Sequence, residues 1–170
     1  MRSIVPGALF ASLPVQNIAT LRFNFRGIEG SEGEFDDGLG ERSDLISAIE
    51  LLNDVVEGLP IFVVGWSFGA DIALTVTHST LAGWFLVAPP LREQFQREMA
   101  AGADPRPKQF SIPQNDQYRP PDEVIEFVKG WTNTSVDIVK GADHFLVGRL
   151  DVVVSQCESF INSVIKEKNV

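Results

Sequence analysis

Short apolar runs alternate with segments of helical periodicity along most of this sequence, and that alternation restricts the fold more than any single motif. The runs that predict strands are Ile18–Phe25, Ile61–Val64, Gly83–Ala88, Lys108–Ile112 and Ser135–Val139. The segments that predict helices are Glu41–Glu57, Phe68–His78, Leu91–Ala101, Pro121–Lys129 and Leu150–Lys166. Strands that alternate with helices favour a mostly parallel sheet with helices on both faces. The sequence therefore predicts an α/β fold, a three-layer sandwich formed by residues 1–170 as a single domain.

Charge and composition narrow the possible functions. The net charge of −9 argues against a nucleic acid or an anionic membrane as a partner, because both are polyanions. No apolar run approaches the roughly 20 residues that span a bilayer. Cys157 is the only cysteine, so the chain can form neither an internal disulfide nor a cysteine-rich metal site. We expect a cytoplasmic protein.

The first residues imitate a short signal peptide, since Met1-Arg2-Ser3 precedes the mostly apolar segment Ile4–Val15. Pro6, Gly7 and Pro14 interrupt that segment, and it runs almost directly into a predicted strand. We therefore favour a first helix that packs on the sheet over a secretory signal.

The motif Gly65-Trp66-Ser67-Phe68-Gly69 lies between an apolar strand and a helix. In a G-x-S-x-G motif with this context, the glycines allow a tight turn that lifts the serine hydroxyl above the sheet. The Phe68 N–H then points toward the carbonyl that reacts with Ser67, as an oxyanion donor. The alternative is a glycine-rich turn in which Ser67 caps the helix.

A serine hydroxyl needs a base, and the chain has two histidines. His78 is 11 residues beyond Ser67 on the same predicted helix, about 16 Å along its axis, and is better placed to stabilise the helix C-terminus. His144 lies in the loop after the last predicted strand, at the same end of the sheet as Ser67. The alternative for His144 is an ordinary surface histidine.

Asp116 is the preferred acid to orient the histidine, because it follows the strand Lys108–Ile112 at a carboxyl end. Asp143 is the residue next to His144, and the side chains of adjacent residues seldom face each other. Asp71 is one helical turn beyond Ser67, and Asp137 lies within a strand. Choosing Asp116 gives the order Ser, Asp, His that is expected of this kind of sheet.

Two other features suggest sites that we do not favour. The acidic loop from Glu29 to Asp37 does not have the spacing of a calcium loop, and we expect it to be solvated. Cys157 lies within the last amphipathic helix, away from any strand-to-helix turn, and is expected to be a buried structural thiol rather than a nucleophile.

Several segments together carry a family resemblance. Besides the motif around Ser67, they are residues 21–27 (LRFNFRG), 31–38 (SEGEFDDG), 87–90 (VAPP), 141–145 (GADHF) and 148–151 (GRLD). Over nearly the whole chain they resemble the small, capless bacterial α/β-hydrolases related to dienelactone hydrolases and serine esterases. The resemblance implies that Ser67, Asp116 and His144 occupy the catalytic positions of that family. Such relatives usually have Gly-Asp before the acid, where this chain has Pro113-Gln114.

The chain departs from the family pattern at its front end. Relatives have strands before the first helix, and one loop among them supplies a second oxyanion N–H. The absent strand would lie between Ile18–Phe25 and Ile61–Val64, and would leave a gap near 10 Å to be closed or filled. We therefore expect a truncated gene model or a fragment of a longer hydrolase. The absence of in-frame coding sequence upstream of Met1 would contradict this expectation.

The predicted reaction is acyl transfer to water, with a small-molecule ester or thioester as substrate. Trp66 and Phe68 flank the nucleophile, so that one lines an acyl pocket and the other packs beneath it, and Tyr118 borders the site. No metal or organic cofactor is implied. A peptidase or an acyltransferase would use the same chemistry, and a non-catalytic binding or interaction module is the alternative from another class. An open sheet edge could be covered by a second copy in a homodimer.

Overall fold

The computed structural model describes residues 3–168, in which four strands form one parallel sheet. The strands follow one another across the sheet in the order of the sequence, and all neighbouring pairs are parallel. They are β1 (Ile61–Trp66), β2 (Leu81–Val87), β3 (Lys108–Pro113) and β4 (Thr134–Val139). These four strands were predicted from the sequence, each within two residues at either end.

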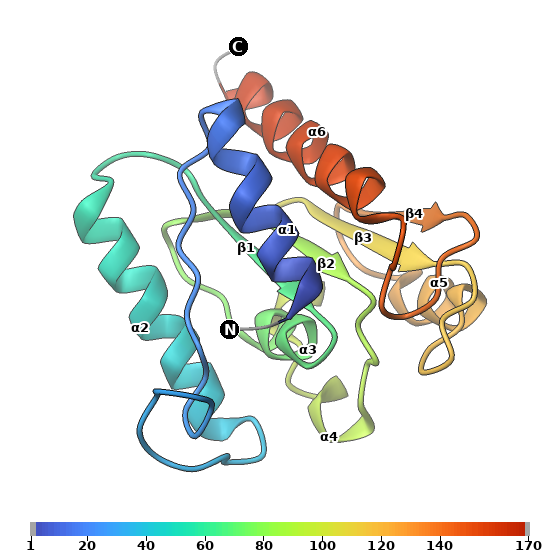
Figure 1. Cartoon of the computed structure of the whole chain (residues 1–170), viewed down its shortest axis with the longest axis horizontal. Helices are drawn as coiled ribbons and strands as arrows, with labels where there is room; N and C mark the ends of the chain where they lie inside the picture. Colours follow the sequence, from blue (N-terminus) through green and yellow to red (C-terminus); the bar gives the residue numbers. More distant parts are fainter. Residues whose placement is uncertain (1–2, 169–170) are drawn as a thin grey trace.

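Helices cover both faces of the sheet (Figure 1). Residues of α1 and α6 pack on one face, and residues of α2, α3 and α5 pack on the other. The helices are α1 (Ile4–Ser12), α2 (Leu39–Val55), α3 (Phe68–Thr75), α4 (Glu93–Gln96), α5 (Pro121–Val128) and α6 (Leu150–Lys168), with 3₁₀ turns at Leu13–Gln16 and Ala100–Ala103. The predicted α/β sandwich of three layers is therefore confirmed, and so is a first helix that packs on the sheet.

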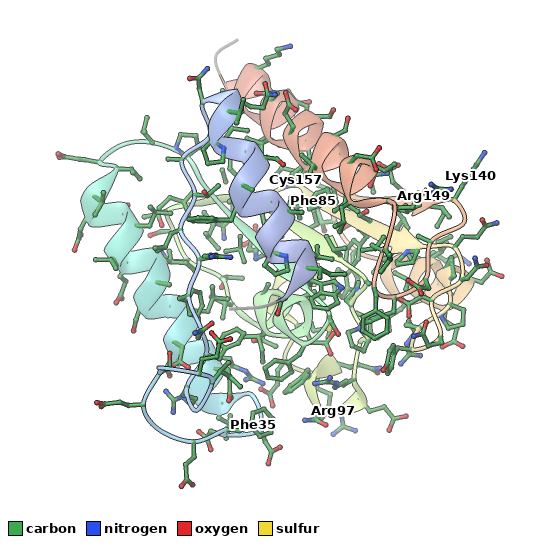
Figure 2. All side chains as sticks on the ribbon, in the orientation of Figure 1. Phe35, Phe85, Arg97, Lys140, Arg149 and Cys157 are labelled. Atoms are coloured by element: carbon green, nitrogen blue, oxygen red, sulfur yellow. The ribbon has the colours of Figure 1, made fainter. Side chains whose placement is uncertain are left out.

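The strand β2 shows how the two apolar cores are divided. All of its residues are buried, and successive side chains point to opposite faces, as they do in any strand. Trp84 and Leu86 join the core beneath α2, α3 and α5, whereas Phe85 joins the core beneath α1 and α6. Cys157 of α6 packs in the same core as Phe85 (Figure 2). Such a strand, buried on both faces, is typical of a parallel sheet.

The prediction of a strand at Ile18–Phe25 is wrong, because this segment is extended but belongs to no ladder. No backbone hydrogen bond joins Ala19–Phe23 to another described residue. The residue pattern suits a strand, but a strand also needs a neighbour whose backbone it can reach. In the described part of the chain the sheet ends at β1, and a groove separates β1 from this segment.

Two predicted helices are shorter than expected. The helix α3 ends at Thr75 rather than His78, since Val76 is extended and its carbonyl accepts a hydrogen bond from the Trp84 indole at 3.3 Å. The segment Leu91–Ala101 forms only the short helix α4 and a 3₁₀ turn. Leu91 has a positive φ of 50°, and this prevents a helix from starting there.

No helix within residues 3–168 is both long enough and apolar enough to cross a membrane.

Candidate active site

The three residues singled out from the sequence lie on loops at the carboxyl ends of three strands. Ser67 follows β1, Asp116 follows β3, and His144 follows β4. The register aligns these strand ends, because Trp66 pairs with Val87 and Pro113 pairs with Val139. The loops therefore leave the sheet on the same edge, where groups from distant parts of the chain can meet.

Ser67 occupies the single residue between β1 and α3 in a conformation that most residues avoid. Its φ is +52° and its ψ is −124°. Such a backbone geometry costs on the order of 1–3 kcal/mol for a residue other than glycine, and it persists only where the surroundings enforce it. The Ser67 carbonyl accepts hydrogen bonds from the N–H groups of Ala70 and Asp71, which fixes the first turn of α3.

Gly65 is the residue that makes this turn sterically possible. A Cβ atom at Gly65 would lie 2.6 Å from the Cα of Ala70 and 2.6 Å from the carbonyl oxygen of Gly69. At Gly69 the nearest atom to an added Cβ is in the Phe25 ring, at 3.9 Å. Of the two glycines in the motif, only Gly65 is therefore required for the close approach of α3 to β1.

The three side chains form one hydrogen-bonded chain. The Ser67 Oγ lies 2.9 Å from the His144 Nε2. The His144 Nδ1 lies 3.0 Å and 3.1 Å from the two carboxylate oxygens of Asp116. His144 and Asp116 are both buried, at 3% and 5% exposure, so little water competes for these bonds.

Backbone and side-chain bonds hold the acid loop against the histidine loop. The N–H of Tyr118 donates to Asp116 at 2.9 Å and orients the carboxylate. The N–H of Asn115 donates to the Ala142 carbonyl, and the Gly141 N–H donates to the Gln114 side chain at 2.8 Å. Gln114, where relatives are expected to have aspartate, thus ties the two loops together.

Three aromatic rings surround the His144 imidazole. The ring centroids of Tyr118, Phe145 and Trp66 lie 4.4, 5.5 and 5.8 Å from the imidazole centroid. The Trp66 indole N–H also donates to the backbone carbonyl of His144 at 3.2 Å. Trp66 therefore lies beside His144 and also holds the loop that carries it. Phe145 was not predicted as a site residue, although its place next to His144 was a signal.

The other titratable candidates lie elsewhere or have other partners. The Asp143 carboxylate accepts hydrogen bonds from the N–H groups of Phe145 and Leu146 in its own loop. Asp137 is exposed and accepts a hydrogen bond from Gln109. His78 lies beyond the end of α3 and bonds to the Thr80 hydroxyl at 2.8 Å, so the predicted role at a helix C-terminus is not seen.

Asp71 supports the site from inside the molecule. It is fully buried in α3, and its carboxylate accepts hydrogen bonds from the backbone N–H groups of Leu91 at 2.9 Å and Arg92 at 3.3 Å. Burial raises the pKa of Asp71 from 3.8 to about 6, although the two N–H donors oppose the shift. The carboxylate thereby ties the helix that follows Ser67 to the loop after β2.

Cys157 has the environment of a structural thiol. It is fully buried on the face of α6 that packs on the sheet, and burial raises its pKa to about 12, so that the thiolate is disfavoured. Within residues 3–168 no group of three or more His, Cys, Asp or Glu side chains is arranged to hold a metal ion.

A groove of about 1240 Å³ opens beside Ser67 and is lined mostly by apolar and aromatic side chains. Trp66, Phe68 and Tyr118 all contribute to its walls at the end nearest the serine. From there the groove continues along β1 to Pro60 at the other end of the strand.

Comparison with known proteins assigns the fold. No protein-family model matches the sequence. An uncharacterized protein of Rickettsia prowazekii is 32% identical over 135 residues, which make up 74% of this chain, and the chain spans only 57% of that protein's length. The solved structure of an α/β serine hydrolase homologue from Coxiella burnetii superposes with a TM-score of 0.82 at 28% identity, covering 92% of this chain and 77% of that one. A lidless α/β serine hydrolase from Xanthomonas campestris gives a TM-score of 0.85 at 21% identity, over 96% and 74% of the two chains.

The close approach of α3 to β1 predicts different effects of substitution at the two glycines. We expect Gly65→Ala to destabilise the fold by about 1–3 kcal/mol or more, because the new methyl group would overlap backbone atoms that cannot move independently. Gly69→Ala should change the free energy of unfolding by less than about 1 kcal/mol. Urea denaturation of the two variants and the parent chain measures both effects. Equal stability of the two variants would contradict this account of the turn.

Burial of Asp71 predicts a pH dependence of stability. Between about pH 4 and pH 6 the folded state keeps a proton on Asp71 that the unfolded state loses, so the free energy of unfolding should fall as pH rises through this window. The fall attributable to Asp71 is at most about 3 kcal/mol.

Denaturation curves at several pH values test this expectation. In Asp71→Asn the decrease between pH 4 and pH 6 should be smaller than in the parent chain, because the amide does not ionise. Asp54→Asn, which removes an exposed carboxylate from α2, is the control for loss of one charge. An unchanged pH slope in Asp71→Asn would rule out the proposed protonation.

Proposed function

We propose that this chain, which has the fold of the α/β-hydrolases, hydrolyses a carboxylic ester or thioester through an acyl-enzyme intermediate on Ser67. The observation that carries the proposal is the hydrogen-bonded chain from the Ser67 Oγ through His144 to Asp116, with distances of 2.9 and 3.0 Å. A nucleophile, a base within reach of it, and an acid that orients the base are the three parts that serine hydrolysis requires.

In the proposed first step the Ser67 Oγ attacks the substrate carbonyl while the His144 Nε2 takes the hydroxyl proton. Asp116 accepts the Nδ1–H of His144, which keeps the tautomer with a free Nε2 and stabilises the imidazolium. The imidazolium then gives its proton to the leaving alcohol or thiol as the carbon–oxygen or carbon–sulfur bond breaks. Water then attacks the acyl-Ser67 ester while His144 takes a proton from it, and the imidazolium returns that proton to the Ser67 Oγ as the acyl carbon–oxygen bond breaks and the acid leaves.

The Phe68 N–H is the proposed donor to the oxyanion. Phe68 is the first residue of α3, and N–H groups in the first turn of a helix have no partner within that helix. A complete oxyanion hole uses two or more donors, and loss of one typically costs about 10²–10³ in rate.

A non-catalytic binding module is the second candidate. The groove of about 1240 Å³ favours it, since the groove continues along β1 far beyond the few atoms that an ester reaction involves. Reactivity of the serine separates the two candidates, because a binding module does not need an activated hydroxyl.

Labelling with a fluorophosphonate, followed by intact-mass measurement, tests the proposed nucleophile. We expect one adduct on the parent chain and none on Ser67→Ala. His144→Ala should slow labelling by about 10²–10⁴, the usual contribution of a general base. His78→Ala is the matched control, because His78 lies away from the site and bonds to Thr80. A folded parent chain that forms no adduct would overturn the hydrolase proposal and favour the binding module.

A further inference from the structure

We propose that Arg92 binds an anionic group on the acyl part of the substrate, so that this chain prefers monoesters or monothioesters of dicarboxylic acids to those of uncharged fatty acids. This preference belongs to the reaction proposed at Ser67 and therefore rests on that proposal. Three features carry it: the position of the Arg92 guanidinium over Phe68, its lack of a hydrogen-bonded partner, and the bonds that fix the loop before it.

The loop after β2 brings Arg92 to the edge of the sheet where Ser67 lies. β2 pairs with β1 inside the sheet, so the position of Arg92 does not depend on what lies beyond the outer edge of β1. The Arg92 Cζ lies 5.1 Å from the centroid of the Phe68 ring, and Phe68 directly follows Ser67 in the chain. A cation therefore lies next to the residue whose N–H is the proposed oxyanion donor.

The Arg92 guanidinium has donors available for a ligand. Its side chain is 41% exposed, and no described residue accepts a hydrogen bond from it. Its ion-pair partner is Asp71, with 4.0 Å between Nε and Oδ2, which is too long for a hydrogen bond. The Asp71 carboxylate is fully buried and already accepts two backbone N–H groups. A guanidinium in this state can offer two parallel N–H groups to one carboxylate.

Side chains from two other segments fix the backbone just before Arg92. Leu91 has a positive φ of 50°, and its carbonyl accepts hydrogen bonds from Gln96 at 2.8 Å and from Arg119 at 3.2 Å. The Arg119 Nε also donates to the Pro90 carbonyl at 3.0 Å. Arg119 is thus used to hold this loop, whereas Arg92 is not. Because the backbone is already ordered, a ligand that binds Arg92 has less entropy to offset.

Ring contacts separate the two sides of Ser67. The His144 imidazole and the Phe68 ring have different neighbours, and no described residue contacts both rings. The neighbours are Tyr118, Phe145 and Trp66 for the imidazole, and Phe25, Phe35, Phe95 and Arg92 for the Phe68 ring. The leaving group has to lie beside His144, because the imidazolium gives it a proton. The acyl part, which is the other substituent of the reacting carbonyl, is then directed toward the Phe68 side, where Arg92 lies.

A cation at this place matters because the chain as a whole is acidic. The net charge of −9 opposes the approach of an anionic substrate. Arg22 and Glu29 are the other described residues with opposite charges along the groove, and they interact electrostatically with each other. Arg92 therefore supplies the positive charge that attracts an anionic acyl group to the Phe68 side of the serine.

Two esters with the same number of acyl carbons test the preference. Para-nitrophenyl hydrogen adipate has a terminal carboxylate, whereas para-nitrophenyl hexanoate ends in a methyl group, and Ser67→Ala gives the background rate for both. We expect the parent chain to have the higher kcat/KM for the adipate ester. In Arg92→Gln the ratio of the two kcat/KM values should fall about tenfold or more, because a charge-assisted contact is lost. Arg92→Lys keeps the charge without the planar fork and should recover part of the ratio.

Arg97→Gln is the matched control for loss of one positive charge. Arg97 directly follows α4, is exposed, and does not line the groove (Figure 2). The ratio for the two esters should be nearly the same in Arg97→Gln as in the parent chain. Circular dichroism checks that both glutamine variants fold, which is expected because neither arginine side chain is buried.

A binding measurement separates this inference from hydrolysis. Methyl hydrogen adipate is titrated into Ser67→Ala, which cannot form the acyl-enzyme, and binding is followed by the NMR signals of the ligand. Its affinity should be about tenfold or more weaker in Ser67→Ala with Arg92→Gln, whereas binding of methyl hexanoate should be nearly unchanged. Binding that depends on Arg92, in a chain whose serine does not react with a fluorophosphonate, would reject the hydrolase proposal and keep the anion site.

Three results would overturn the role of Arg92. One is a parent chain that prefers the hexanoate ester. Another is equal binding of methyl hydrogen adipate with and without Arg92. The third is an equal fall of the kcat/KM ratio in Arg97→Gln, which would show an effect of overall charge rather than a site.

Discussion

The arrangement of the site depends on how closely α3 packs against the end of β1. An added Cβ at Gly65 would lie 2.6 Å from backbone atoms of α3, so the strand and the helix meet without a side chain between them. A turn of one residue, Ser67, joins the two elements, and Ser67 adopts a positive φ in it. Its hydroxyl is thereby raised toward the loops after β3 and β4. Asp71, buried one turn further along α3, holds the loop after β2 in place from beneath.

The sequence allowed the order of the site residues to be predicted because each follows an element with a clear pattern. A parallel sheet brings the ends of its strands to one edge, so Ser67, Asp116 and His144 could be placed together from strand assignments alone. The bond from the Trp66 indole to the His144 carbonyl could not be foreseen, because it depends on how two loops meet. Asp71 did have a signal, since it stands among Ala70, Ile72 and Ala73, all of which are buried apolar residues.

The wrong prediction at residues 18–25 has a physical reason. The prediction used the alternation of apolar and polar residues and the content of β-branched and aromatic residues, which are properties of side chains. A strand, however, forms only when its backbone is paired with a neighbour. Here the nearest strand, β1, lies across a groove, and the segment stays extended without a ladder. Residues with the pattern of a strand thus line a space in which no described strand lies.

The strand order has a consequence for how the protein folds. Each strand pairs with the next one along the chain, so the sheet can grow stepwise from β1 to β4, with a helix or loop closed at each step. Ser67 follows the first strand, whereas His144 follows the fourth and Asp116 the third. A partly folded chain that contains β1 and β2 alone would have the strained turn at Ser67 but neither of the loops that carry Asp116 and His144. The hydrogen-bonded contact between Ser67 and His144 can therefore form only after the last strand has joined the sheet.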